Sequence, residues 1–334
     1  MKILILFNRA VVLKKGVPGD LVCEQEIDII VPLVEQVLRS RGHEVMALEA
    51  AIDLWSRLLA IKGEIDIVLN LAEGFGGSNT NEATVPAILE ALGIPFTGAS
   101  LRNMIYTMDK EKTNLTVSGY GIPTPRREVF RPEVPLPIET RLPFPVIVKP
   151  VWEEASVGIT DDSVVSNQAD LARKVRQVFS FYRQPALVER FVIGREISVG
   201  IVGNGQETHI FPPLEFVFDP AVPELQRIRS YEYKWGGTKE NMVKAQLPAA
   251  TIALLRRYTR VAYRVMDCRD YARIDYRLTS GGRIFLLEVN YNPGIGPNTH
   301  GLNNTLTMMA SFEDVSFGDL IERIVVTAKN RYIQ

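Results

Sequence analysis

The sequence has few cysteines, and this scarcity excludes several classes of protein. Cys23 and Cys268 are the only two among 334 residues, and they lack the CxxC spacing of metal and redox motifs. Two cysteines cannot form a disulfide scaffold, so the sequence favours a reducing, cytoplasmic environment.

An excess of charge of one sign is also missing. The chain has 38 Lys and Arg against 39 Asp and Glu, which gives a formal net charge of −1. Proteins that bind nucleic acids or membrane surfaces usually carry a basic excess, so neither partner is expected.

Long hydrophobic runs and internal repeats are absent as well. The apolar run at residues 3–7 is too short for a signal segment or a membrane span, so we expect a first buried strand and a cytoplasmic protein. The composition, 46% hydrophobic and 23% charged, is that of a folded globular chain. Its length predicts two or three domains.

Strand-like and helix-like segments alternate in the first hundred residues. Apolar runs at 3–7, 45–48 and 65–71 have the length of strands. Residues 27–38 and 85–92 show helical spacing, and both segments end near a glycine. This alternation predicts a parallel sheet covered on both faces.

The remaining sequence predicts two further units. The expected elements are a helix over 109–118, a Pro-rich loop over 131–145, a strand over 146–149 and a helix over 169–181, then strands over 187–189, 196–202, 272–278 and 284–289, with helices over 250–265 and 317–329. The third unit is expected to start at the strand over 187–189.

The strongest pattern of functional residues lies on the last two expected strands. Glu288 and Asn290 share a face, and hairpin pairing across 280–282 brings Asp275 beside them, with Arg273 on the same face. Two carboxylates and an amide oxygen between apolar neighbours call for a cation. These ligands suit Mg²⁺, whose shell substrate phosphates usually complete. The alternative is a structural ion-pair network of Arg273, Asp275 and Glu288.

Weaker signals precede this hairpin. Lys149 ends an apolar strand before the loop 153–158, where lysine and backbone N–H groups can bind phosphate. Lys110 lies in an early helical turn. Taken alone, each lysine is more commonly explained as a surface residue. The segment 189–192 followed by Glu196 could bind adenine and ribose, or be an edge strand with an ion pair.

Together these motifs resemble the ATP-grasp superfamily, and within it the D-alanine–D-alanine ligase family. The resemblance covers almost the whole chain and rests on the segments 89–98, 108–110, 146–150, 188–191, 273–275 and 286–294. It implies an α/β (α+β) ATP-grasp fold with three domains. These would be an N-terminal parallel-sheet domain over 1–98, a central phosphate-loop subdomain over 99–186 and a C-terminal subdomain with the magnesium site over 187–334. A homodimer is a further implication.

The resemblance also implies roles for individual residues in binding ATP and magnesium. The phosphate lysines would be Lys110, Lys149 and Lys234, and the last is aligned only across a gap. The adenine would contact Glu189, Arg190, Phe191 and Val192, and the ribose Glu196. Two Mg²⁺ ions, or Mn²⁺ in their place, would be held by Asp275, Glu288 and Asn290.

The family reaction has two steps. A carboxylate attacks the γ-phosphate of ATP to give an acylphosphate and ADP, and an amine then displaces phosphate to form an amide. Arg273 and the backbone N–H of Gly294 would stabilise the tetrahedral intermediate. Because water must be excluded, the loop 153–158, which contains Ser156, is expected to close over the site.

The amino-acid half departs from the family pattern. In the loop, Ala155 replaces the first of two serines, and Glu154 replaces a glycine, which adds a charge that is unfavourable near phosphate unless it points away. Glu24, with Glu26 in reserve, is the candidate for binding the first substrate's ammonium group. A family histidine is replaced around Glu73, and the motif for the second substrate's carboxylate falls near residues 299–300.

We therefore expect an ADP-forming carboxylate–amine ligase that joins two amino acids or amino-acid-like molecules. One alternative is an authentic D-alanine–D-alanine ligase of peptidoglycan synthesis. Another, of a different class, is an ATP-binding regulatory protein that has lost turnover. The presence of both lysines and all three magnesium-ligand candidates disfavours this last alternative.

Overall fold

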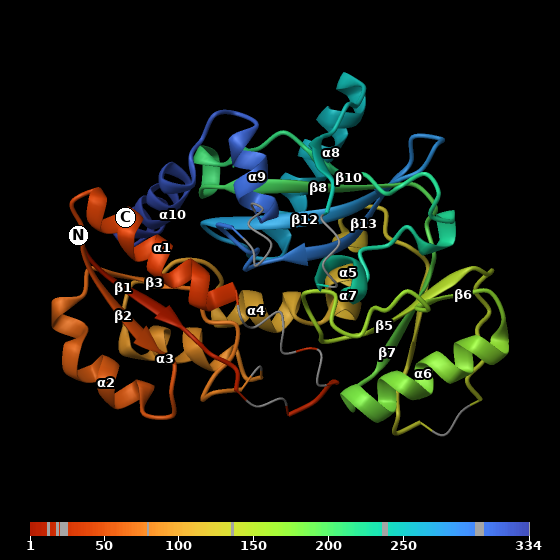
Figure 1. Cartoon of the computed structure of the whole chain (residues 1–334), viewed down its shortest axis with the longest axis horizontal. Helices are drawn as coiled ribbons and strands as arrows, with labels where there is room; N and C mark the ends of the chain where they lie inside the picture. The colour runs from red at the N-terminus through yellow and green to blue at the C-terminus, as the bar shows by residue number, and fades with distance from the viewer. Residues whose placement is uncertain are drawn as a thin grey trace.

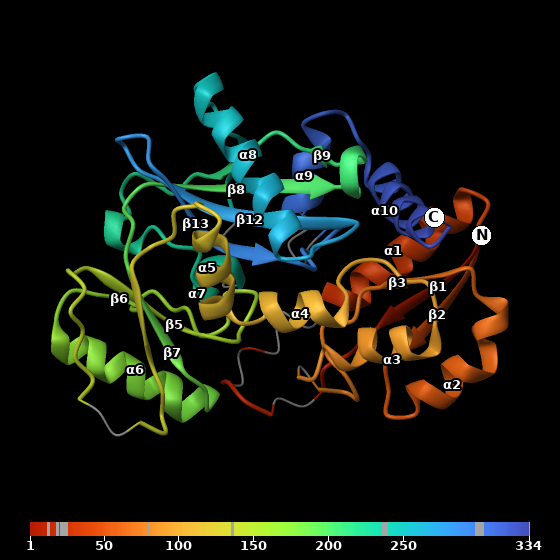
Figure 2. The ribbon, with the colours of Figure 1, turned by 180° about the vertical axis from the view of Figure 1, so that it is seen from behind.

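A computed structural model describes residues 1–11, 14–17, 20, 26–78, 80–134, 137–235, 240–297 and 304–333. Three sheets follow one another along the chain, and helices pack on their faces (Figures 1 and 2). None of the helices in these ranges combines the length and the apolar character that a bilayer crossing requires.

The first sheet is parallel, as predicted. It contains β1 (Lys2–Phe7), β2 (Glu44–Glu49) and β3 (Ile67–Asn70) in the order β2-β1-β3. Alternate residues of β1 enter two different cores, with Ile3 and Ile5 in one and Leu4 and Leu6 in the other. The sheet is therefore buried on both faces, which is the rule for parallel sheets.

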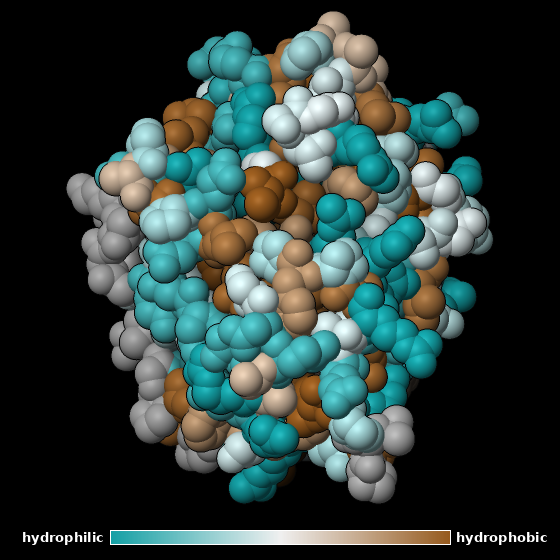
Figure 3. All heavy atoms as spheres, turned by 90° about the vertical axis from the view of Figure 1, so that its right-hand side faces the viewer, coloured by the Kyte–Doolittle hydropathy of each residue, from teal (hydrophilic) through white to brown (hydrophobic). Residues whose placement is uncertain are grey.

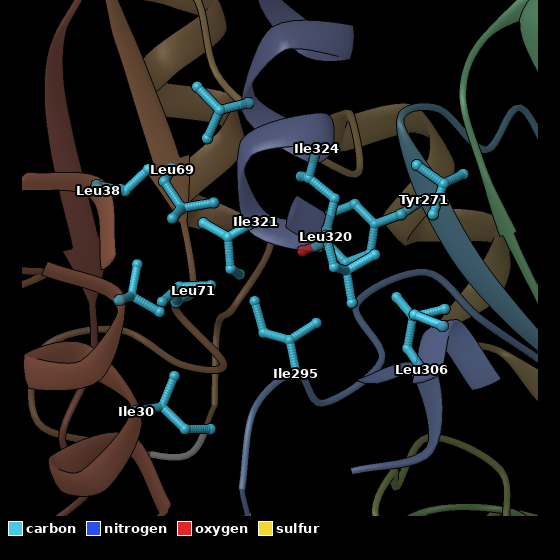
Figure 4. Close-up of a cluster of buried hydrophobic side chains, with 14 of the residues drawn as sticks. Ile30, Leu38, Leu69, Leu71, Tyr271, Ile295, Leu306, Leu320, Ile321 and Ile324 are labelled. Carbon is cyan, nitrogen blue, oxygen red and sulfur yellow. The ribbon is translucent and has the colours of Figure 1, made fainter. Parts of the chain in front are cut away.

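Helices from both ends of the chain cover this sheet. On one face lie α1 (Ile27–Ser40) and α10 (Phe317–Arg331), and on the other α2 (Leu54–Ile61) and α3 (Thr84–Leu92). Figure 4 shows Ile321 and Ile324 of α10 between Leu69 and Tyr271. The last helix thereby joins the first sheet to the large third sheet.

The central sheet is antiparallel, in the order β4-β7-β5-β6. Its strands are β4 (Arg127–Phe130), β5 (Val146–Pro150), β6 (Val164–Val165) and β7 (Ala186–Arg190), and α6 (Gln168–Tyr182) packs against them. The residues expected to start the third unit thus form β7 of the central sheet. We propose that the domain boundary follows β7, while the boundary at residue 98 stays a prediction.

The third sheet is the largest and has the order β11-β10-β8-β12-β13, with β9 paired to β8. Its strands are β8 (Arg195–Val202), β9 (His209–Ile210), β10 (Leu214–Phe216), β11 (Met242–Lys244), β12 (Tyr271–Leu278) and β13 (Ile284–Asn290). The remaining helices are α4 (Leu101–Thr107), α5 (Lys110–Gly119), α7 (Tyr231–Trp235), α8 (Ala249–Val265) and α9 (Thr305–Ser311).

A core between the third sheet and helices α5 and α8 decides which side chains face the opposite side. In β12, Ala272, Ile274 and Tyr276 enter this core, so Arg273 and Asp275 point the other way. The sheet thus presents an apolar face to α5 and α8. Its other face carries the polar residues Arg273 and Asp275 beside apolar residues, Tyr271 and Leu214 among them, that share a core with α9 and α10.

A β-bulge interrupts the same alternation in β13. Asp275 pairs with Glu288, but Tyr276 pairs with Leu286, so Leu287 is the extra residue. Leu286 and Val289 both enter the core, although three positions separate them. The bulge therefore lets the consecutive residues Leu287 and Glu288 face the same cavity.

The surface over the central sheet and the adjoining edge of the third sheet has a mixed character. In Figure 3, which views the molecule from the right-hand side of Figure 1, hydrophobic residues are interspersed with hydrophilic ones. Scattered surface hydrophobics of this kind are normal for a globular protein.

Candidate active site

The predicted nucleotide and metal residues line one cavity between the central and third sheets. They come from α5, β5, β7, β8, α7, β12 and β13, from the loop after β5 and from the connection between β7 and β8. The residues concerned are Lys110, Lys149, Ser156, Glu189, Arg190, Phe191, Val192, Glu196, Lys234, Arg273, Asp275, Glu288 and Asn290. The structure therefore brings together the whole ATP half of the predicted site.

Lys110 is held by carboxylates from two other segments. Its Nζ lies 2.7 Å from Glu288 Oε1 and 3.8 Å from Glu154 Oε1, and it donates to the Glu153 carbonyl. Burial lowers the pKa of Lys110, but Glu154 and Glu288 more than offset this effect, so the net pKa is raised. Lys110 is thus a buried cation, and its interpretation as a surface lysine is wrong.

Lys149 is a second buried cation in the cavity. Its Nζ lies 2.5 Å from Glu189 Oε2, while Asn114 donates to Glu189 Oε1 at 3.1 Å. The Glu189 side chain is therefore occupied in orienting Lys149. The edge that could bind adenine is the backbone at the end of β7, as the sequence suggested.

Asp275 accepts hydrogen bonds from three side chains. Arg273 donates at 2.9 Å, Ser198 Oγ at 2.5 Å and Asn290 Nδ2 at 3.0 Å. Burial raises the pKa of Asp275, but Arg273, with smaller effects from Ser198 and Arg229, more than offsets burial, so the net pKa is lowered. The ion-pair alternative is thus partly present: Arg273 pairs with Asp275, while Glu288 pairs with Lys110.

The side chains at the predicted metal site supply only part of the coordination shell of Mg²⁺, so a bound substrate would have to supply further ligands. Within the described ranges, no three His, Cys, Asp or Glu side chains gather as a metal site. Asp275 and Glu288 are direct neighbours across β12 and β13, and Arg273 pairs with Asn290 in register. Two carboxylates and one amide oxygen leave most of an octahedral shell to phosphate oxygens and water, which is how Mg²⁺ usually binds with a nucleotide.

Two arginines and one leucine are among the cavity residues that the sequence reasoning missed. Arg277 contacts Glu196 at 2.6 Å, and Arg229 contacts Glu240 at 2.7 Å. The third is Leu287, which the bulge places in the cavity. Alternation along β12 could have revealed Arg277, which lies two residues after Asp275, but no local pattern marks Arg229.

The loop after β5 is shaped by backbone conformation and by α7. Ala155 and Ser156 have φ values of 53° and 65°, which L-residues with a side chain adopt at some cost. Trp235 Nε1 donates to the Ala155 carbonyl at 3.2 Å. Glu154 does not point away from the phosphate lysines, because its carboxylate faces Lys110.

A second and larger cavity adjoins the first. It is lined by Glu26, Glu73, Glu154, Arg273, Gly294 and Asn304, among other residues, and it shares Arg273, Asn290 and Lys234 with the nucleotide cavity. Glu24 and the motif near 299–300 lie outside the described residues. The residue that lines the cavity is Glu26, the reserve candidate, and Asn304 Nδ2 donates to it at 3.4 Å.

Glu73 is an acidic group in this second cavity. Its side chain is exposed and lines the cavity, and neighbouring protein atoms remove part of the water around the carboxyl group. Desolvation and the nearby Glu26 raise the pKa of Glu73 to about 7, and Lys234 partly opposes them.

Comparisons with known proteins agree with this geometry. The family profile described as "D-ala D-ala ligase C-terminus" matches residues 112–326. An uncharacterized protein, y4sG, of Sinorhizobium fredii is 34% identical over 306 residues, covering 90% of this chain and 87% of that one. A D-alanine--D-alanine ligase of Geobacter sulfurreducens is 30% identical over 93% of this chain and 92% of its own.

Solved structures share the fold. A D-alanine--D-alanine ligase from Bacillus anthracis complexed with ATP matches with a TM-score of 0.75 at 19% identity and covers 99% of each chain. The VanG D-Ala:D-Ser ligase from Enterococcus faecalis matches with a TM-score of 0.71 at 17% identity, covering 98% of this chain and 100% of that one. The chain therefore belongs to the D-alanine–D-alanine ligase family and has the ATP-grasp fold.

Proposed function

We propose that this protein is an ATP-dependent, ADP-forming ligase that joins the carboxylate of one amino acid or amino-acid-like molecule to the amine of another. The observation that carries the proposal is the junction of two cavities. One gathers Lys110 and Lys149 opposite Asp275 and Glu288, and the other begins at the shared Arg273.

When ATP binds in the nucleotide cavity, two lysines would exchange their carboxylate partners for phosphate oxygens. Lys110 and Lys149 now contact carboxylates, and phosphate oxygens would take those places. Asp275, Glu288 and Asn290 would then hold Mg²⁺, or Mn²⁺ in its place. The metal would offset negative charge during phosphoryl transfer.

The amino-acid half would bind the reacting carboxylate next to Arg273. This side chain is fixed by Asp275 and by Thr305 Oγ1 at 2.9 Å, so its charge is preorganised for the tetrahedral intermediate. The backbone N–H of Gly294 would assist, and Glu26 would bind the donor ammonium. The loop 153–158 would exclude water, which otherwise hydrolyses an acylphosphate.

The second candidate function is an authentic D-alanine–D-alanine ligase, favoured by the curated names of related ligases. Ala155 and Glu73, which depart from the family pattern, favour other substrates. Phosphate release should be measured with pooled D- and L-amino acids, and the products weighed by mass spectrometry. A response to D-alanine alone would establish this second candidate, while mixed products would support other substrates. A homodimer and a cytoplasmic location remain predictions.

Replacing Gly294 with alanine is expected to weaken donor binding. A Cβ at this position would lie 3.1 Å from the Asn304 carboxamide, which contacts Glu26, so the substitution would displace both side chains. We expect the KM for the donor to rise by about tenfold, because small displacements in a reacting site have large effects. ATP binding should be unchanged. Gly63→Ala, where a Cβ meets no atom within 4 Å, is the control.

Donor binding is expected to depend on pH through Glu73. An acid whose pKa is raised to about 7 is neutral below that pH and anionic above it. If the donor's ammonium faces Glu73, its KM should fall several-fold as the pH rises through about 7. Glu73→Gln should lose this pH dependence. An unchanged KM profile in the variant would assign the dependence to another group.

A further inference from the structure

The proposed reaction gives no role to Glu154, whose carboxylate lines the second, larger cavity. Glu154 follows β5 on the loop that approaches the phosphate lysines, and its side chain is 29% exposed. Its Oε1 atom is buried and accepts no hydrogen bond within the described part of the chain. The 3.8 Å separation from Lys110 Nζ is an ion pair but too long for a hydrogen bond.

The position of Glu154 marks the boundary between the two cavities. Lys110 lines the nucleotide cavity but not the larger one, whereas Glu154 lines the larger one but not the nucleotide cavity. Their ion pair therefore crosses the point where a phosphoryl group would pass from ATP to the donor carboxylate. Glu154 lies on the substrate side of that point, in the same cavity as Gly294 and Arg273.

The loop holds Glu154 in this place. Lys110 also binds the Glu153 carbonyl, and the left-handed residues Ala155 and Ser156 turn the chain immediately after Glu154. The Trp235 indole then fixes Ala155. Glu154 itself is not among the non-glycine residues with positive φ, so a side chain at this position adds no backbone strain of that kind.

A buried carboxylate oxygen without a hydrogen-bond donor is costly, and a cationic N–H donor would satisfy it best. Two amino groups would enter the cavity, one on the donor and one on the acceptor. The charged neighbours of Glu73 are Glu26 and Lys234, whereas those of Glu154 are Lys110, Glu288, Arg273 and, as the smallest effect, Glu73 itself. The two acids therefore lie in the same part of the cavity, but Glu154 is the one beside the phosphate lysine.

We propose that Glu154 binds the ammonium group of the acceptor and so selects a cationic amine as the second substrate. The bound ammonium loses one proton to solvent before its nitrogen attacks the acyl carbon, and inorganic phosphate leaves as the amide forms. This inference rests on the proposed ligase function. Glu154 is a positioning residue in this role, because it holds the nucleophile beside the activated carbonyl carbon. The substitution of a charged residue for the family's glycine would then change acceptor choice.

The test compares a cationic with a neutral nucleophile in Glu154→Gln. The acceptors are D-alanine or, if it is not used, the pooled amino acids, and the neutral nucleophile is hydroxylamine at neutral pH. We expect the KM for the amino-acid acceptor to rise by about ten- to hundredfold, as for loss of a charged hydrogen bond. Hydroxamate formation and the KM for ATP should change less than about threefold.

Other outcomes overturn the inference. An equal loss with both nucleophiles, or a changed KM for ATP, would show that Glu154 acts through Lys110. An unchanged KM for the amino-acid acceptor would show that Glu154 does not bind the acceptor. Glu154→Asp, which keeps the charge, should recover part of the acceptor binding, and it serves if Glu154→Gln fails to fold. Glu64→Gln, on an exposed turn, is the matched control.

The same experiment separates this inference from the proposed function. If the unmodified protein forms no hydroxamate from ATP and any amino acid, the proposed ligase function fails. If it forms hydroxamate and Glu154→Gln leaves the acceptor KM unchanged, only the inference about Glu154 fails.

Discussion

Glu288→Ala is expected to lower ATP turnover by about a thousandfold or more, because the substitution removes two electrostatic functions at once. Glu288 lies opposite Asp275 on the paired strands and 2.7 Å from Lys110 Nζ. Its loss would remove a proposed magnesium ligand. It would also leave Lys110 with Glu154 as its remaining side-chain partner, so the lysine would shift from its position.

ADP formation with and without amino acids measures this effect. Glu288→Gln keeps the shape of the side chain but not its charge, and it should be nearly as inactive. Glu133→Ala, at an exposed position in the Pro-rich loop, should retain full turnover. A Glu288→Ala protein with more than about a tenth of normal turnover would mean that Glu288 is only part of a structural ion-pair network.

Asp270→Ala is expected to give the largest loss of stability, about 3–5 kcal/mol of the free energy of unfolding. Asp270 is fully buried and accepts hydrogen bonds from Gly98 N, Asn204 Nδ2 and Arg331, each at 2.8 Å. Gly98 lies at the end of the first unit, Asn204 in the turn after β8, and Arg331 at the end of α10. The substitution would leave three donors, one of them charged, without their acceptor.

Chemical denaturation followed by circular dichroism measures this loss. Asp53→Ala is the control, because within the described part of the chain the Asp53 side chain forms an exposed ion pair with Arg57 at 3.8 Å and no other ion pair or hydrogen bond. Such a pair contributes between about 0 and 1 kcal/mol, so the midpoint should hardly move. A similar stability for the two variants would contradict the role of Asp270 in joining the three segments.

Local sequence patterns predicted most of the fold, because the elements with strong periodicity also form the cores. Alternation along β12 placed Arg273 and Asp275 on one face, as the structure confirms. The short helices α2, α4, α7 and α9 and the short strands β4, β6, β9, β10 and β11 were missed. In α2, Trp55 and Leu59 are exposed, which weakens the amphipathic pattern that identifies a helix.

The features that could not be predicted depend on contacts between residues that are distant in sequence. No local signal could assign β7 to the central sheet, because the assignment depends on its pairing with β4 and β5, and strand formation depends strongly on such neighbours. Lys110 was ambiguous for the same reason: its burial results from Glu154 and Glu288, which come from other segments. The bulge at Leu287 was visible only as an irregular spacing of apolar residues.

The central claim is that ATP activates a carboxylate on this protein. The most direct measurement supplies ATP, magnesium, pooled amino acids and hydroxylamine, and quantifies nucleotide products and hydroxamates together. We expect ADP to equal the sum of the hydroxamate and the dipeptide products, and we expect none of these products with Glu288→Ala. Bound ATP with no turnover for any amino acid, or release of AMP in place of ADP, would contradict it.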